Sequence, residues 1–186
     1  MKTIKITITG ILLLITSITF SQIKSDKITP PSKGKSVIYF IRTSGLGALM
    51  NFRYFDGDKY LGRFNGVNYL RYECSPGEKK FWIKAENVDV LKANLKANKI
   101  YLVETNASMG VFAATAKFKL VDYNKKSQVK RINRLFKKKD GKTFSNKELK
   151  KQFDKMQKAF KKGLKKVNSK IKKGKFKEIT KEMSLK

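Results

Sequence analysis

The chain has 186 residues, with 44 Lys and Arg against 14 Asp and Glu, a formal net charge of +30, no His and one Cys. The absence of His removes the commonest general base and metal ligand, together with every Ser-His or Cys-His nucleophile arrangement. A single Cys cannot form an intrachain disulfide, so a hydrophobic core must hold the fold together.

The first part of the chain, residues 1–21, is typical of a secretory signal peptide. It has a positive start at Lys2 and Lys5, an apolar run over residues 6–20 and small residues before a cut ahead of Gln22. A transmembrane helix, the alternative, needs about 20 apolar residues, whereas this run has about 15 and is interrupted by Thr and Gly. We therefore expect an exported protein that is periplasmic, envelope-associated or secreted. No Cys lies near the cut, which disfavours a lipid-anchored form.

A β-domain is expected over residues 36–122, after a polar extended leader at residues 22–35 that contains Pro30-Pro31. Short β-branched and aromatic runs recur there, separated by Gly, Pro, Asn and Asp. Their number and spacing predict about seven or eight strands in an antiparallel β-sandwich of the Ig-like kind or in a small barrel. Residues 88–95 alternate imperfectly, so a short helix is the alternative to a strand at this point.

Three turn signals predict where strands pair. Asp56-Gly57-Asp58-Lys59 has the composition of a hairpin turn, and Asn65-Gly66 is a strong two-residue hairpin signal because both residues tolerate positive φ. Ser75-Pro76-Gly77 lies between two further strand signals and predicts another hairpin. We therefore expect neighbouring strands in the sequence to be neighbours in the sheet.

A lysine-rich helical tail is expected over residues 123–186. Residues 124–186 carry 23 Lys and 2 Arg against 5 acids, so they supply 20 of the 30 net positive charges. Apolar spacing predicts one helix over residues 128–139, and a capping box of Ser145 and Glu148 predicts the start of a second. The second helix carries an apolar stripe with a narrow arc, formed by Leu149, Phe153, Met156, Phe160, Leu164, Val167 and Ile171. The tail is thus predicted to be a pair of amphipathic helices.

Turn and core positions within residues 35–122 form a pattern: the first strand, the Asp56-Gly57-Asp58-Lys59 hairpin, the Ser75-Pro76-Gly77 turn before Lys80-Phe81-Trp82-Ile83, and Ala97-Asn98-Lys99-Ile100-Tyr101. This pattern resembles the DUF2846 family, small exported bacterial β-domains without an assigned function. The order of hairpin and Pro-Gly turn is also similar to that of PEGA-like surface β-domains. The resemblance covers about half the chain and implies a fold rather than an activity. The chain differs from many members in lacking a lipidated Cys, and the lysine-rich tail falls outside the resemblance.

The remaining residues that could carry chemistry have simpler structural explanations. Cys74 follows the burial tendency of free cysteine, and without His it has no obvious partner to lower its pKa. Trp82 is expected in the sandwich core. Asp56 and Asp58 lack the ligand count of a calcium loop. We therefore predict no catalytic, cofactor-binding or metal-binding residues, and no enzyme.

The tail has three interpretations. In the first, its apolar stripe docks on the sandwich or on the helix over residues 128–139 and leaves the lysines in water. Alternatively, the stripe enters an anionic membrane while the lysines contact headgroups or another envelope polyanion. Nucleic acid is the third partner, but the tail has no aromatic residues placed for base stacking and no recognised motif, so specific nucleic-acid binding is disfavoured. For the anionic-surface hypothesis, the residues are Lys151, Lys155, Lys158, Lys162, Lys166, Phe153, Met156, Phe160 and Leu164.

From these patterns we expect a non-catalytic envelope-associated protein whose tail contacts an anionic membrane or envelope polymer. The alternative is a β-sandwich module that binds a protein or glycan and whose helices merely pack on its core.

Overall fold

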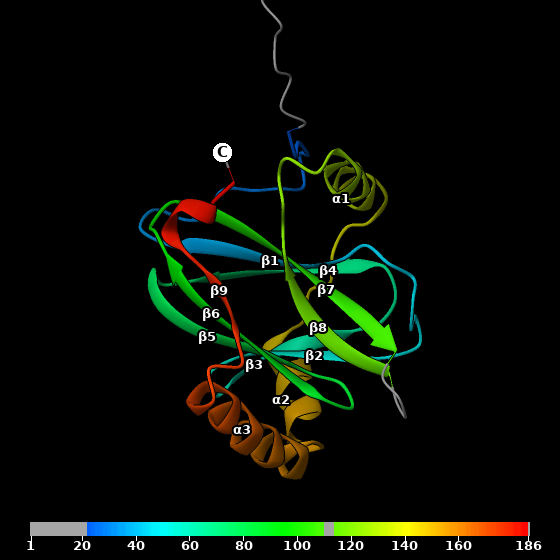
Figure 1. The fold of residues 1–186 in the computed structure, drawn as a ribbon, viewed down its shortest axis with the longest axis vertical. Helices are drawn as coiled ribbons and strands as arrows, with labels where there is room; N and C mark the ends of the chain where they lie inside the picture. Colours follow the sequence, from blue (N-terminus) through cyan, green and yellow to red (C-terminus); the bar gives the residue numbers. More distant parts are fainter. Residues whose placement is uncertain (1–21, 110–113, 186) are drawn as a thin grey trace, which may run out of the picture.

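The computed structural model describes residues 22–109 and 114–185, so the predicted signal peptide, residues 1–21, lies outside the described residues. Figure 1 shows two β-sheets packed face to face between helices at opposite ends of the molecule. Sheet A has the order β4-β1-β7-β8 and sheet B the order β3-β2-β5-β6-β9. The strands are β1 (Ser36–Arg42), β2 (Phe52–Asp56), β3 (Lys59–Phe64), β4 (Asn68–Cys74), β5 (Gly77–Lys84), β6 (Val88–Leu95), β7 (Ile100–Met109), β8 (Ala114–Leu120) and β9 (Lys177–Ile179). The helices are α1 (Lys126–Lys138), α2 (Asn146–Asp154), α3 (Gln157–Lys172) and the short 3₁₀ turn η1 (Lys181–Met183).

The prediction of a mainly β protein with a helical C-terminal part is confirmed, but the sheets are not purely antiparallel. β1 pairs with β7 in parallel, and β6 pairs with β9 in parallel. Between β1 and β7 the chain forms β2 and β3 in sheet B, returns to sheet A as β4 and then adds β5 and β6 to sheet B. Residues 36–122 contain eight strands, within the predicted seven or eight, and β9 in the tail is a ninth. The tail contains three α-helices rather than the predicted two.

Two of the three predicted hairpins are wrong. Asp56-Gly57-Asp58-Lys59 does join a β2–β3 hairpin, and Gly57 has φ +53°. By contrast, the Asn65-Gly66 and Ser75-Pro76-Gly77 segments carry the chain between the two sheets, because β3 and β5 lie in sheet B whereas β4 pairs with β1 in sheet A. Turn residues specify a reversal of the chain, but they do not specify which strand it will pair with. Residues 88–95 form β6, which pairs with β5 along its whole length.

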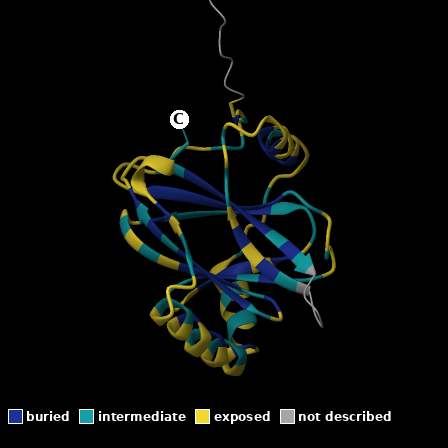
Figure 2. Ribbon diagram, in the orientation of Figure 1, coloured by how far each residue is buried: buried dark blue, intermediate teal, exposed yellow. Residues whose placement is uncertain are grey.

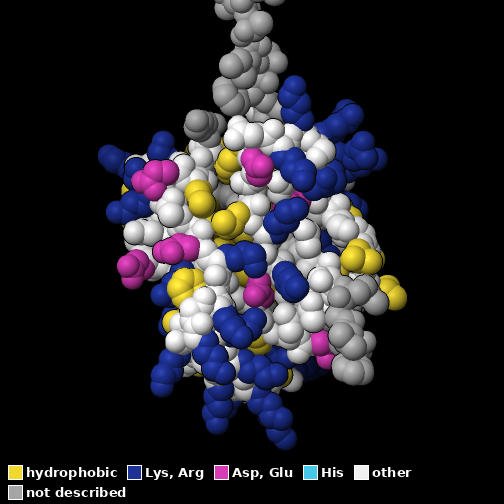
Figure 3. Space-filling view, viewed as in Figure 1, with side chains coloured by type: hydrophobic (Ala, Val, Ile, Leu, Met, Phe, Trp, Pro, Cys, Tyr) yellow, Lys and Arg dark blue, Asp and Glu magenta, His cyan; other side chains and the backbone are white. Residues whose placement is uncertain are grey.

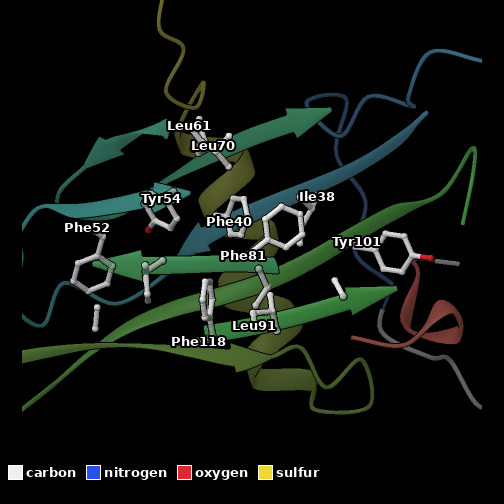
Figure 4. Packing of buried hydrophobic residues seen from close by; sticks show 14 of the residues in the cluster. Ile38, Phe40, Phe52, Tyr54, Leu61, Leu70, Phe81, Leu91, Tyr101 and Phe118 are labelled. Atoms are coloured by element: carbon white, nitrogen blue, oxygen red, sulfur yellow. The ribbon is translucent and has the colours of Figure 1, made fainter. Parts of the chain in front are cut away.

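Aromatic and aliphatic side chains fill the space between the sheets. Figure 4 shows Phe40 of β1 beside Tyr54 of β2 and Phe81 of β5. The ring centroids of Phe40 and Tyr54 are 5.2 Å apart and those of Phe40 and Phe81 are 5.3 Å apart. This buried cluster supplies the core that a chain without disulfides needs.

The outer faces of both sheets are also covered. All seven residues of β1 are buried, because Ile38 and Phe40 face the other sheet while Tyr39 and Ile41 face α1. On the opposite side, α2 and α3 lie over the outer face of sheet B. Figure 2 shows the resulting four layers, with buried strands in the middle and the exposed faces of the helices outside.

The leader and the tail are integral parts of this arrangement. Ile23 of the leader is buried beside α1, and the Lys24 backbone N–H donates to Asn133 Oδ1 at 3.1 Å. β9 extends sheet B, although it lies in the segment predicted to be only helical. The β-strands, the leader and the tail therefore share one packed structure.

Candidate anion-binding surface

The second helical segment begins where the capping box predicted. The Ser145 hydroxyl accepts from the Glu148 backbone N–H at 3.3 Å, and Glu148 Oε2 accepts from the Ser145 backbone N–H at 2.7 Å. The Ser145 backbone N–H, followed by the Ser145 hydroxyl at 2.8 Å, donates to the Glu148 carboxylate and holds its pKa below the ordinary value. The cap satisfies backbone donors at the start of α2 and sets its direction across sheet B.

The predicted continuous stripe is divided into two helices. α2 ends at Asp154 and α3 begins at Gln157, with Met156 between them. Met156 is buried, and its backbone N–H donates to Phe153 O at 2.9 Å. The break lets two short helices follow the outer face of the sheet, which one straight helix of this length would cross at a single angle.

The apolar stripe packs against an aromatic layer on sheet B. Phe55 and Trp82 stack with ring centroids 3.8 Å apart, and Phe160 of α3 lies 5.7 Å from each of these rings. Trp82 is fully buried, but it lies under α3 and not between the sheets as predicted. The stripe residues Phe153 and Phe160 are half-buried in this layer and Leu164 is half-buried on α3, so they could enter a bilayer only if the helices first left the sheet.

The five predicted lysines all lie at exposed positions of α2, of α3 or of the link between these helices. Lys151, Lys155, Lys158, Lys162 and Lys166 are exposed, and none forms an ion pair with an acid among the described residues. Figure 3 shows Lys and Arg side chains projecting from the end of the molecule formed by α2 and α3. We call this set of five residues the lysine face.

Sheet B adds cations that the sequence reasoning missed. Arg53 of β2 lies opposite Arg63 of β3 on one side and opposite Lys84 of β5 on the other. Arg53, Arg63, Lys151, Gln152, Lys155 and Met156 line a hollow of about 220 Å³ between the sheet and α2. The β2–β3 hairpin signal could have suggested the Arg53–Arg63 pair, but the approach of α2 has no local signal in the sequence.

The two buried acids are held by structural partners. Asp89 Oδ2 accepts from the Phe118 backbone N–H at 2.8 Å, and Lys170 and Lys177 each place Nζ 3.5 Å from its carboxylate. Glu104 accepts from the Thr43 hydroxyl and from Gln128 Nε2, both at 2.6 Å. Asp89 of β6 therefore links sheet B to β8 of sheet A and to α3, and Glu104 of β7 links sheet A to α1.

Cys74 is buried, and burial raises the pKa of its thiol to about 11. The thiol is therefore protonated at neutral pH, as expected for a structural cysteine. No group of three or more Cys, Asp and Glu side chains within residues 22–109 and 114–185 is arranged to hold a metal ion.

Helices long and apolar enough to cross a bilayer are absent from the part of the chain that the structure describes. The chain matches no protein-family model and shows no significant similarity to a curated protein.

Proposed function

We propose that this is an exported, non-catalytic protein that attaches to an anionic envelope surface through the lysine face of α2 and α3. The observation that carries the proposal is the exposure of all five lysines on one side of a docked helical layer, without acidic partners among the described residues. The signal-like residues 1–21 support export to the periplasm, the envelope or the medium.

The physical basis is electrostatic attraction. Each Lys near an anionic membrane contributes about 1 kcal/mol, so several lysines on one rigid face can hold the protein at the surface. Because exposed charges are screened over about 10 Å at 0.1 M salt, this attachment weakens steeply as salt increases.

In this proposal the apolar stripe of α2 and α3 does not insert into the membrane. Phe153, Met156 and Phe160 pack on Phe55, Tyr60 and Trp82, so insertion would expose this aromatic layer to water. We therefore propose that the helices stay docked and that the protein lies on the surface through charge alone.

Co-sedimentation with phosphatidylglycerol vesicles tests this proposal. Lys158→Glu with Lys162→Glu should reduce binding at low salt at least about tenfold, since four units of charge change on the face that meets the lipid. Lys130→Glu with Arg134→Glu on α1 is the matched control, because both pairs are exposed and four residues apart on a helix. Equal losses in the two variants, or no binding by the unaltered protein, would contradict the proposal.

A binding module for a protein or glycan is the second candidate, and the loop between β1 and β2 favours it. Leu49 is 90% exposed and Leu46 is 51% exposed there. The buried Arg42 guanidinium holds this loop by donating to Met50 O at 2.9 Å and to Leu46 O at 2.8 Å. Leu49→Ser should leave the melting temperature unchanged and lower the affinity for a protein or glycan partner.

The packed sheets are compatible with the resemblance to the DUF2846 family and with an Ig-like or PEGA-like relationship, which we retain as proposals. Turn and core positions support them, and neither assigns an activity.

A further inference from the structure

Three cations form a row across the outer face of sheet B. The strand register places Arg63 of β3 opposite Arg53 of β2, and Arg53 opposite Lys84 of β5. Like charges directly opposite each other destabilise a sheet. No ion pair joins these three side chains to an acid within the described parts of the chain. The row therefore lowers stability unless an external anion neutralises it.

The helical layer adds to this positive charge. Lys151 of α2 and Lys155, which follows the last residue of α2, contribute to the lining of the 220 Å³ hollow, to which no described Asp or Glu contributes. Beside it, burial, Arg53 and Lys166 lower the pKa of Lys84, while Glu86 opposes them. Four cationic side chains from three different elements thus converge on one small space.

A hydrogen bond fixes the wall of the hollow. The Tyr60 hydroxyl donates to Gln152 Oε1 at 2.7 Å and ties β3 to α2. Burial raises the pKa of Tyr60 to about 12, although Arg63 and Arg53 lower it. Tyr60 is therefore a neutral donor at physiological pH, and the wall keeps its shape across that range.

Other cationic hollows lack this combination. The hollow between the leader and α1 is lined by Asp26 as well as by basic residues. Most of these basic residues lie on one helix, α1. The hollow beside Asn87 contains Lys170, which is paired with Asp89, and no Arg. Of these three hollows, the one over sheet B combines two arginines from adjacent strands with two lysines that have no acidic partner among the described residues.

We propose that Arg53, Arg63, Lys151 and Lys155 form a binding site for a phosphate group, either free in solution or on a lipid headgroup. Planar guanidinium groups bind phosphate oxygens through two parallel hydrogen bonds, and lysines add point charges. The site rests on the proposed function and deepens it, because it makes one part of a general anionic contact selective for phosphate.

Binding of inorganic phosphate to the purified protein, measured by titration calorimetry at constant ionic strength, is the first test. Arg53→Gln with Arg63→Gln should weaken phosphate binding about tenfold or more. The same variant should melt at a temperature equal to or above that of the unaltered protein, since it removes the repulsion between Arg53 and Arg63. Loss of binding with retained stability separates a lost site from a lost fold.

Lys158→Gln with Lys162→Gln is the matched control, because it removes the same charge from exposed positions that do not line the hollow. It should weaken vesicle binding and leave phosphate affinity within about twofold. Equal phosphate affinity in the two double variants would overturn the site, as would binding of phosphate no tighter than sulfate or acetate at equal ionic strength. If the protein binds phosphate but does not bind anionic vesicles, the proposed function is wrong and the proposed phosphate site stands.

Vesicles distinguish the two sources of the phosphate. Phosphatidic acid exposes a phosphomonoester, whereas phosphatidylglycerol carries a diester, and the two lipids are compared at matched surface charge. A preference for phosphatidic acid that disappears in Arg53→Gln with Arg63→Gln supports a headgroup ligand. Binding of inorganic phosphate without that preference supports a soluble phosphate.

Discussion

The two outer faces of the sandwich are both covered by lysine-rich amphipathic helices, yet the two layers differ in depth and in charge balance. On sheet A, α1 buries Val129, Ile132 and Phe136 completely. On sheet B, α2 has no fully buried residue and α3 buries only Gly163 and Val167. Similar sequence patterns therefore produce a core helix on one face and a shallow covering layer on the other.

The charges under the two layers differ in the same way. Beneath α1, the buried Glu104 binds Gln128, and Arg131 lies 3.9 Å away. Beneath α2, Arg53 and Arg63 oppose each other without a described acid nearby. The carboxylate beneath α1 has partners within the protein, whereas the arginines beneath α2 have no acidic partner among the described residues, so an external anion can neutralise them. Under the function proposed above, α1 serves stability and α2 and α3 serve binding.

The largest expected effect is on the core of the α1 layer. Phe136→Ala should lower the free energy of unfolding by about 3–5 kcal/mol, because the ring is fully buried against Tyr39 and Tyr69. Phe160→Ala on α3 should cost about half as much, since that ring is only half-buried. Urea denaturation measures both values. Equal costs would show that the two layers have the same depth.

The next effect concerns the polar contact under α1. Gln128→Leu should cost about 2 kcal/mol, because it removes the hydrogen bond from Nε2 to a buried carboxylate. The additional change Glu104→Gln should recover part of that loss, since a neutral amide is cheaper to leave without a partner. Thermal and urea denaturation of the single and double variants measure the coupling. If the losses in unfolding free energy at the two positions are additive, Gln128 and Glu104 do not interact.

A smaller effect is expected where α3 touches Trp82. A Cβ at position 163 would lie 2.9 Å from Trp82 Cζ3, so Gly163→Ala must move α3 away from the sheet. The crowding should outweigh the gain in helix propensity and cost about 1 kcal/mol net. Tryptophan fluorescence reports the change directly, because the chain has a single Trp. An unchanged emission spectrum together with increased stability would show that the added methyl group does not push α3 away from Trp82.

The smallest effect is a pH dependence at high pH. Burial, followed by Tyr39, Asp140 and Asp26, raises the pKa of Tyr69 under α1 from 10.0 to about 12. Since the folded state holds this proton more tightly, the stability that Tyr69 contributes is present below pH 10 and is lost as the pH rises towards 12. Tyr69→Phe should therefore reduce the fall in melting temperature across this range. If the melting temperature of Tyr69→Phe falls as steeply as that of the unaltered protein, Tyr69 is not a source of this pH dependence.

Local signals in the sequence predicted the elements well. The β-branched and aromatic runs, the Asp56-Gly57 turn and the Ser145–Glu148 capping box all depend on neighbours within a few residues, and each corresponds to the structure. The exposed side of the helices was also predictable, because the lysines and the apolar stripe alternate with helical periodicity.

Only the tertiary structure decided which elements lie together. The crossing of β3 to β4 between sheets, the parallel β1–β7 and β6–β9 pairs and the break at Met156 arise from packing between distant segments. The same is true of the site, since Arg53 and Arg63 meet through strand register and Lys151 and Lys155 join them only when α2 docks. The sequence by itself determined the periodicity of the elements and the start of α2, because those depend on local backbone and side-chain preferences. The convergence of four cations was decided in three dimensions, because it depends on contacts between residues far apart in the chain.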